Sequence, residues 1–319
     1  MEENEDAQYC FQDGNSSCVK SSLSKYFYIT LYIFFSLISA VTVFLNLLVI
    51  ISISQLKQLH TPTNLLILSL AVSDLLVGLF VIPSMTAAIM EPCWVLGEYF
   101  CALLLCTTFL CSNSSLGNLV LISIDRYVAV CDPLMYHLKI TAKKTVCRIS
   151  IFWCFCILCD AVVIKITVNV QVPSRCFEEC FFVIGNIWVE ILALFISMIV
   201  PCSIIITLYL KIFVVARSQA RKVNSNKAVT VLGVKTAQAN KSERKAAKTL
   251  SIVVFNYLIC WIPIYFVKYI YFASGNSLST FICFLPLINS FINPIIYAFF
   301  YPWFKVTAKH ILTMKLWHL

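Results

Sequence analysis

Ionisable side chains are rare within the apolar stretches of this sequence, so each one there is a candidate for chemistry. They are Asp74, Asp125, Arg126, Asp160, Lys165, Glu190 and Lys268. A charge in apolar surroundings is costly unless it meets a ligand, an ion or a group of opposite sign. Asp125 and Arg126 are neighbours and can form an ion pair, although exposed pairs by themselves stabilise little. Asp160 and Lys165 are five residues apart and poorly placed to pair along one helix, but either can find a partner on a neighbouring helix.

Seven apolar segments must position these residues. Each is about 20 residues or longer, enough to cross a hydrocarbon layer about 30 Å thick. The 319 residues are 60% hydrophobic and only 12% charged, which leaves too few polar side chains to cover a soluble globule. The sequence therefore predicts an all-α fold, a seven-transmembrane helix bundle that forms one domain over residues 27–301. The segments lie at about 27–53, 63–90, 99–131, 147–170, 183–214, 247–272 and 279–301.

Basic residues cluster in loops that would lie on one side of a membrane. A dense group of Lys and Arg lies between residues 217 and 248, and another lies between residues 139 and 148, whereas the loops on the other side carry few. Basic loops stay in the cytoplasm, so the N-terminus is predicted to be extracellular and the C-terminus cytoplasmic. The net charge of +9 then reflects topology, with attraction to acidic membrane lipids as a second contribution, and no nucleic-acid partner is expected.

The two ends of the chain carry separate signals. Residues 1–26 form a polar extracellular tail with a glycosylation sequon at Asn15. The apolar segment that follows is too long for a signal peptide and is expected to remain in the protein. Residues 302–319 interleave Lys305, Lys309 and Lys315 with apolar side chains, which is typical of a short amphipathic helix at the inner membrane interface. A frayed tail is the alternative.

Each of the seven segments also contains one short motif built on a polar, aromatic or proline residue. The motifs are Asn46, residues 68–74 ending in Asp74, Asp125-Arg126-Tyr127, Trp153, Pro201, Cys260-Trp261-Ile262-Pro263 and Asn293-Pro294-Ile295-Ile296-Tyr297. In this order they resemble the motifs of rhodopsin-like (class A) G protein-coupled receptors, and the resemblance covers nearly the whole chain. Residues 289–304 and 57–64, together with Cys93-Trp94, are similar to the trace amine-associated receptors within that class.

The resemblance implies roles for two groups of residues. Arg126 would be held by Asp125 at rest and would swing out to meet a G protein; the coupling and switch residues are Asp125, Arg126, Tyr127, Asn293, Pro294 and Tyr297. Trp261, beside Pro263, would be the bulky group that a ligand moves. Asp74 and nearby oxygen atoms could hold a hydrated cation, which the resemblance implies is an allosteric sodium ion; a water-filled hydrogen-bond network is the alternative. The sodium ligands would be Asp74, Asn46, Asn289, Ser290 and Asn293.

The resemblance further implies two disulfide bonds outside the membrane. The first is Cys101–Cys180, which would join the third segment to the second outer loop. The second is Cys18–Cys176, which would join the N-terminal tail to the same loop, and Cys10 and Cys93 are left without assigned partners. Such bridges restrict the loops that cover a ligand pocket.

The predicted ligand pocket departs from that of amine receptors. Where those receptors carry an aspartate in the third segment, this chain has Thr108, and a threonine cannot neutralise a buried ammonium group. The candidate substitutes are Glu190, Asp160 and the two acids at 178 and 179, whereas Lys268 suggests an acidic ligand or a Glu190–Lys268 pair. The pocket candidates are Thr108, Cys111, Asp160, Glu190, Ala193, Ser197, Trp261, Ile264, Tyr265, Lys268 and Leu287.

The sequence thus predicts a plasma-membrane receptor for a small molecule that activates a heterotrimeric G protein. The resemblance implies stimulatory coupling and a chemosensory, olfactory role. A receptor for a non-amine ligand and an orphan receptor with weak coupling are the alternatives. A channel or transporter is disfavoured because the sequence shows no internal repeats. An enzyme is not expected, since no segment contains paired aspartates or a His/Glu metal set, and no cofactor is expected beyond the sodium ion.

Overall fold

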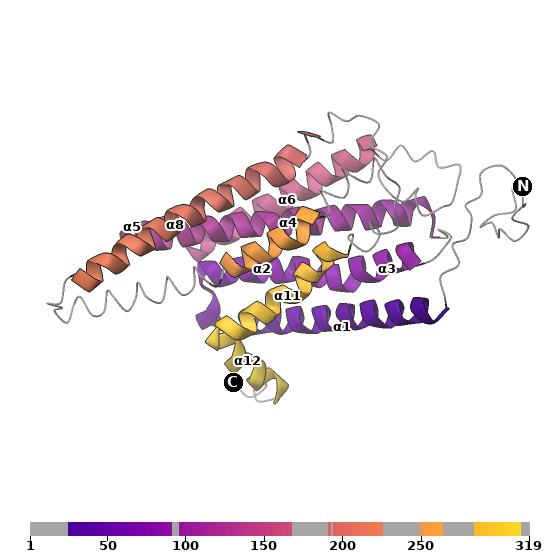
Figure 1. Ribbon diagram of the computed structural model, residues 1–319, viewed down its shortest axis with the longest axis horizontal. Coiled ribbons are helices and arrows are strands. Elements are labelled where there is room, and N and C mark those ends of the chain that lie inside the picture. The colour runs from indigo at the N-terminus through magenta and orange to yellow at the C-terminus, as the bar shows by residue number, and fades with distance from the viewer. Residues whose placement is uncertain are drawn as a thin grey trace, which may run out of the picture.

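The computed structural model describes residues 25–90, 96–167, 191–192, 194–225, 249, 251–263 and 284–313, and its elements there are all helices (Figure 1). The longer helices are α1 (Lys25–Gln55), α2 (Pro62–Leu76), α3 (Ile82–Met90), α4 (Gly97–Cys131), α6 (Ala142–Thr167), α8 (Val200–Ser225) and α11 (Leu285–Phe300). The shorter ones are η1 (Lys57–Leu59), α5 (Pro133–Lys139) and α12 (Pro302–Leu312). Two π-helical turns, η2 (Val77–Val81) and η4 (Phe195–Ile199), precede α3 and α8. One further helix, Ser251–Pro263, lies between α8 and α11 in the sequence.

These helices fall on all seven predicted segments. Five are long and apolar enough to cross a membrane: Tyr28–Gln55, Pro62–Ala88, Tyr99–Cys131, Ala142–Val162 and Phe195–Ser218. The sixth and seventh segments are represented by the shorter apolar helices Ser251–Pro263 and Leu285–Phe300. The prediction of an all-α membrane bundle is therefore confirmed. The tail at 1–24 and parts of the fourth to seventh segments lie outside the described residues, so the domain boundaries stay predictions.

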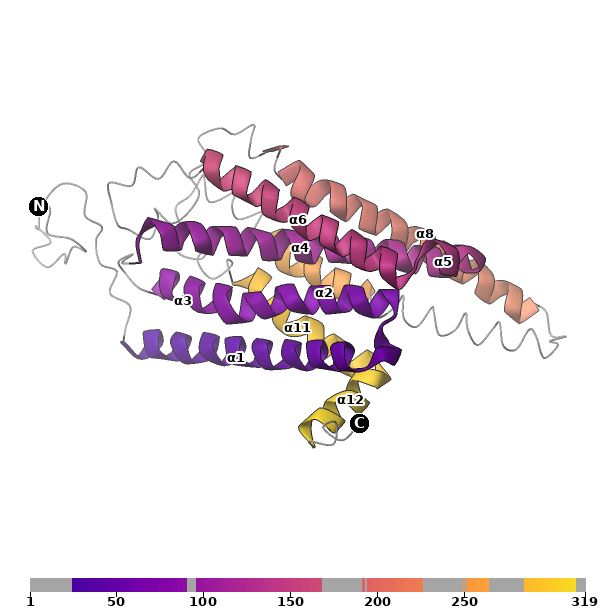
Figure 2. The same ribbon diagram turned by 180° about the vertical axis from the view of Figure 1, so that it is seen from behind.

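The central helix of the bundle is α4. It packs against α2, α6 and α8, while α1 packs against α2, α3 and α11 (Figures 1 and 2). In both views α8 reaches beyond the ends of α1 and α2, as expected for a helix that extends into the following loop. After α11, the chain turns at Tyr301 into α12, which leaves the bundle at an angle and contacts α1.

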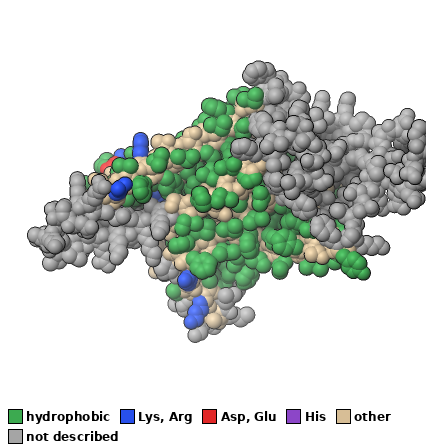
Figure 3. All heavy atoms as spheres, in the orientation of Figure 1, with side chains coloured by type: hydrophobic (Ala, Val, Ile, Leu, Met, Phe, Trp, Pro, Cys, Tyr) green, Lys and Arg blue, Asp and Glu red, His purple; other side chains and the backbone are tan. Residues whose placement is uncertain are grey.

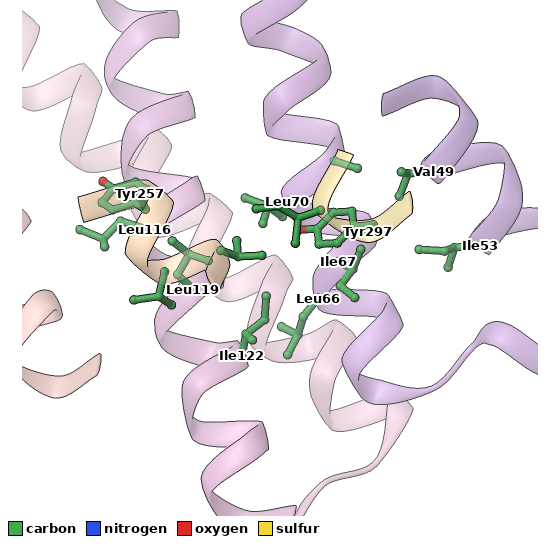
Figure 4. Packing of buried hydrophobic residues seen from close by; sticks show 14 of the residues in the cluster. Val49, Ile53, Leu66, Ile67, Leu70, Leu116, Leu119, Ile122, Tyr257 and Tyr297 are labelled. Carbon is green, nitrogen blue, oxygen red and sulfur yellow. The ribbon is translucent and has the colours of Figure 1, made fainter. Parts of the chain in front are cut away.

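The interior and the surface of the bundle are both apolar. Inside, a cluster from α1, α2, α4, the Ser251–Pro263 helix and α11 surrounds the fully buried Tyr297 (Figure 4). Outside, many large apolar side chains are exposed, among them Phe44, Leu79, Ile151 and Phe213, and hydrophobic atoms cover most of the described face in Figure 3. An apolar surface of this extent is typical of contact with lipid.

Charged side chains gather at one end of the bundle, here called the basic end. It carries the exposed residues Lys57, Lys139, Lys143, Lys144, Arg148, Arg217, Lys305 and Lys309. The same end holds α5 and α12. In α12, Phe304 is buried against the bundle while Lys305 and Val306 are exposed, so the short amphipathic helix predicted after the last segment is present.

Irregular turns adjust the course of two helices. In η2, the Gly78 carbonyl accepts a hydrogen bond from Ser39 Oγ of α1 at 2.7 Å. A side chain at Gly78 would meet Thr42 and Val43 at about van der Waals contact or closer, which explains why a glycine stands where these helices approach. In the fifth segment, η4 ends just before Pro201. A π turn and a proline together mark a place where a helix departs from regular geometry.

Candidate functional site

The motif at the basic end of α4 forms a buried ion pair. Arg126 Nε and Nη2 donate to Asp125 Oδ2 at 3.0 and 2.7 Å, and the two side chains are only 5% and 2% exposed. The pair is therefore buried rather than exposed to solvent. Removing one partner of a buried pair costs about 3–5 kcal/mol, because it leaves an uncompensated charge. The pair consequently holds Arg126 inside the bundle.

Two hydroxyl groups complete this network, and sequence analysis identified neither. Thr63 Oγ1, in the first turn of α2, donates to Asp125 Oδ2 at 2.8 Å and accepts from Arg126 Nη2 at 2.6 Å. Tyr136 OH, in α5, donates to Asp125 Oδ1 at 2.9 Å. Burial, and then the charge of Asp125, raise the pKa of Tyr136 to about 12, so this hydroxyl remains a donor at neutral pH. In the sequence, only the prolines Pro62 and Pro133 indicated that α2 and α5 begin near these two residues.

An open cavity of about 530 Å³ lies beside the network. Its walls come from the start of α2, from α4, α5 and α6, and from the junction of α11 with α12. The residues that line it are Thr61, Pro62, Thr63, Asn64, Arg126, Tyr136, His137, Ile140, Thr141, Ala142, Tyr301 and Trp303. Arg126 is thus bound to Asp125 on one side and borders the cavity on another. Its side chain therefore has space in which to change conformation.

The other predicted switch residues lie on α4 and on α11. The ring of Tyr127 has the ammonium group of Lys211, from α8, 5.9 Å from its centroid. Asn293, Pro294 and Tyr297 are all buried in α11, and the proline lies inside that helix. The switch residues are therefore not one contact cluster but two groups, on α4 and on α11.

Asp74 lies in α2 at the centre of a second polar cluster and is fully buried. Asn293 Nδ2 from α11 donates to Asp74 Oδ2 at 2.9 Å, and Asn46 Nδ2 from α1 donates to the Ser290 carbonyl at 3.1 Å. Helix α11 thus meets α1 and α2, which lie far from it in the sequence. Four of the five predicted sodium ligands, Asp74, Asn46, Ser290 and Asn293, belong to this cluster.

The cluster offers oxygen atoms suited to a cation. Oδ1 of Asp74, of Asn46 and of Asn293 are all buried and have no hydrogen-bond partner among the described residues. Hard cations prefer carboxylate, amide and hydroxyl oxygens. Ser73, the residue before Asp74, has its Oγ 3.1 Å from the hydroxyl of Ser115 of α4, a contact that sequence analysis missed. The residues present therefore fit the predicted ion.

Asn289, the fifth predicted sodium ligand, instead links two helices. Its Oδ1 accepts a hydrogen bond at 2.8 Å from Asn256 Nδ2 of the Ser251–Pro263 helix. One turn further along that helix, the half-buried Trp261 stacks on Tyr257, with ring centroids 5.5 Å apart. Asn256 Oδ1 in turn accepts from Cys260 Sγ at 3.8 Å, so Asn256, a residue with no sequence signal of its own, links the tryptophan motif to Asn289 of α11.

The described part of the predicted ligand pocket is mostly apolar. Thr108 Oγ1 donates to the Leu104 carbonyl at 2.7 Å within α4, so this hydroxyl is already satisfied. Cys111 and Leu287 are buried in an apolar cluster that α3 and η2 share, and Ser197 is half-buried in η4. The candidates that lie outside the described residues are Glu190, Ala193, Ile264, Tyr265 and Lys268.

Asp160 is the acidic pocket candidate within the described residues. Its side chain, 5% exposed, accepts a hydrogen bond at Oδ1 from Asn113 Nδ2 of α4 at 3.0 Å. Its second oxygen, Oδ2, is buried and has no hydrogen-bond partner in the part of the chain that the structure describes. Lys165 is exposed on the same helix, and neither salt bridge among the described residues includes Asp160. The neighbouring-helix partner left open by the sequence is therefore Asn113, an amide rather than a cation.

Cys101, at the start of α4, is disulfide-bonded. The other cysteines within the described residues are free: Cys106, Cys111, Cys131, Cys147, Cys154, Cys156, Cys159, Cys202 and Cys260. Because Cys18, Cys176 and Cys180 lie outside the described residues, the pairings Cys101–Cys180 and Cys18–Cys176 stay predictions. The same holds for glycosylation of Asn15.

Comparison with known proteins gives the family. The family described as 7 transmembrane receptor (rhodopsin family) matches residues 45–297. Trace amine-associated receptor 8c of Rattus norvegicus is 37% identical over 97% of this chain and 93% of its own length. Trace amine-associated receptor 6 of Homo sapiens is 38% identical over 96% and 92%, and trace amine-associated receptor 13c of Danio rerio is 34% identical over 99% and 95%.

These matches confirm the resemblance seen in the motifs and the seven-helix fold. They also agree with the prediction that the chain is a receptor rather than an enzyme, because both the family and the relatives are receptors. The chain belongs to the rhodopsin family of seven-transmembrane, G protein-coupled receptors and, within it, to the trace amine-associated receptors.

Proposed function

We propose that this receptor is a chemosensory, olfactory receptor of the plasma membrane that activates a stimulatory heterotrimeric G protein when a small molecule binds. One observation supports the proposal above all: Arg126 is bound by Asp125, Thr63 and Tyr136 next to an open cavity. A network of this kind stabilises a closed state, which a ligand can then bias toward an open one.

The basic end of the bundle is assigned to the cytoplasm. Exposed Lys and Arg side chains on α5, α6, α8 and α12 support this assignment, since basic segments remain on the cytoplasmic side. The N-terminal tail would then be extracellular. Lys305 and Lys309 on α12 would face acidic lipid headgroups, while its buried Phe304 holds it to the bundle.

Activation requires Arg126 to leave Asp125. Breaking the pair exposes a guanidinium group to the cavity, where it can donate to carbonyl groups of a docked G protein. Asp125, Thr63 and Tyr136 oppose this step because each loses a hydrogen bond when Arg126 leaves. A ligand must therefore supply several kcal/mol of differential binding free energy, roughly the cost of opening a buried pair.

A sodium ion would be held by Asp74 with Asn46, Ser290 and Asn293. The three unsatisfied oxygen atoms of Asp74, Asn293 and Asn46 support this assignment. Bound between α1, α2 and α11, a cation would neutralise the buried carboxylate and stabilise the closed state. A hydrogen-bond network without an ion remains the alternative that experiment must exclude.

A second candidate function is a receptor for a neutral, non-amine ligand. The uncharged side chain of Thr108 and the apolar cluster around Cys111 and Leu287 favour it, because they offer no negative charge to a cation. Signalling through Arg126 would be the same, and only the ligand class would differ.

Cyclic AMP in cells that express the full chain tests the proposed function. Cells are exposed to monoamines, diamines, neutral odorants and acidic odorants of similar size, and Arg126→Ala serves as the control after its surface level is matched. A rise in cyclic AMP that Arg126→Ala abolishes is expected. A ligand-induced fall in forskolin-raised cyclic AMP would instead reject stimulatory coupling.

A further inference from the structure

Asp160 does not lie on the lipid-facing side of α6. Ile157, Leu158 and Val162 on that helix are all exposed and would contact lipid. Asp160 instead points toward α4, as does Cys156, which lies one turn away and is also buried. Asp160 is therefore not a charge that reaches along the helix toward the headgroups, but a group that belongs to the interior.

The Asp160 carboxyl group is only half satisfied. Asn113 binds Oδ1, while Oδ2 is buried with no protein partner among the described residues. A buried acceptor that forms no hydrogen bond costs free energy, and a buried carboxylate without a cation costs more. Folding alone would favour an apolar side chain at this position. An unsatisfied acid retained inside a helix bundle indicates a ligand.

Asn113 also determines which oxygen of the Asp160 carboxyl group is free to accept a hydrogen bond. Its amide N–H donates to Oδ1, which fixes the plane of the carboxyl group and leaves Oδ2 as the free acceptor. The exposed Lys165, five residues further along, is not placed to occupy that acceptor. The missing partner must therefore be a donor, and a cationic one compensates the charge as well as the hydrogen bond.

We propose that Asp160 Oδ2 binds the ammonium group of an amine ligand, with Asn113 as the residue that positions the carboxylate. Asp160 would thus supply the negative charge that Thr108 cannot supply. This inference rests on the proposed function for the arrival of a ligand from the extracellular end. Because Oδ2 is buried, a ligand must displace neighbouring side chains to reach it, which favours short or slender amines.

The test measures ligand binding and signalling separately. The purified full chain is heated with 2-phenylethylamine or isopentylamine, each compared with the alcohol that replaces the ammonium group, and the shift in unfolding temperature reports binding. Cyclic AMP in cells reports signalling with the same compounds. The variants are Asp160→Asn, Asn113→Leu and the matched control Lys165→Gln, which removes an exposed charge from the same helix.

Amines should stabilise the wild type and Lys165→Gln. For Asp160→Asn, the stabilisation should be lost or the amine affinity should fall at least about tenfold, while any response to the alcohols is unchanged. Asn113→Leu should weaken amine binding less, and it tests the same idea if Asp160→Asn does not fold.

Two results would overturn the inference. One is an amine affinity of Asp160→Asn within twofold of the wild type. The other is a wild-type receptor that no amine stabilises, and if an alcohol still raises cyclic AMP, the proposed function stands while this inference fails. Amine stabilisation without any cyclic AMP response would support the inference and count against the proposed coupling.

Discussion

Two buried carboxyl groups, Asp125 and Asp160, have opposite surroundings. Asp125 receives hydrogen bonds from Arg126, Thr63 and Tyr136, which include a full positive charge. Asp160 receives one hydrogen bond, from an uncharged amide, and one of its oxygens has no partner. The two carboxyl groups are similarly buried, so they differ in how far the protein compensates their charge and their hydrogen-bonding needs.

The protein itself compensates the charge of Asp125, whereas it leaves the charge of Asp160 for a ligand to compensate. At the basic end, the charge of Asp125 is compensated from within the chain, so that region stabilises one conformation of the receptor. In the half of the bundle away from the basic end, Asp160 costs free energy until a partner arrives. Functional sites commonly lower stability in this way.

The largest effect is expected from removing the charge of Asp125. Asp125→Asn takes away the ion pair that retains Arg126, which is worth about 3 kcal/mol or more to the closed state. Basal cyclic AMP should rise to a large fraction of the ligand-stimulated level. Asp160→Asn at an equal surface level is the control, and it should leave basal cyclic AMP unchanged. Equal basal activity in the two variants would remove the distinction between the two acids.

A third acid, Asp74, sharpens the comparison because its proposed partner is an ion. The purified wild type should unfold at a temperature a few degrees higher in sodium chloride than in choline chloride at equal ionic strength. Asp74→Asn should abolish that difference, and Asp160→Asn should keep it. A sodium effect that persists in Asp74→Asn would place the ion elsewhere.

A substitution at Tyr136 tests a single hydrogen bond to Asp125. Tyr136→Phe removes the donor to Asp125 Oδ1, which should weaken the closed state by about 1 kcal/mol and raise basal activity about fivefold. Tyr99→Phe is the matched control, because Tyr99 is 86% exposed. Basal cyclic AMP in cells with matched receptor levels is the measurement. No change in Tyr136→Phe would show that the tyrosine does not restrain Arg126.

The smallest effect concerns the stability of the unsatisfied site. Asp160→Asn should leave the unfolding temperature unchanged or raise it slightly, because it removes an uncompensated acid and keeps the shape of the side chain. Asp125→Asn should lower the unfolding temperature in the same assay. A clear loss of stability in Asp160→Asn would mean that Asp160 is a structural residue.

Sequence alone predicted the elements that depend on local pattern. The seven apolar segments, the amphipathic helix at Pro302–Leu312 and the receptor motifs follow from hydropathy, charge periodicity and short strings of residues. Asp74 could be paired with Asn293 only through the family resemblance, since the two lie 219 residues apart.

Partners that depend on how helices pack could not be predicted. Thr63 and Tyr136 reach Asp125 only because the start of α2 and the helix α5 fold back against the end of α4. Asn113 reaches Asp160 because α4 crosses α6 at that level. No periodicity within one segment encodes which side chain of a neighbouring helix it will meet, so the ion pair at Arg126 was expected but its two hydroxyl partners were not.

The most direct test of the account is the exchange of nucleotide on a purified stimulatory G protein, catalysed by the receptor in lipid nanodiscs. With no ligand, Asp125→Asn should exchange nucleotide faster than the wild type, and Arg126→Ala should be no faster than the G protein alone. An Arg126→Ala receptor as active as Asp125→Asn would contradict the claim that release of this arginine couples the receptor to its G protein.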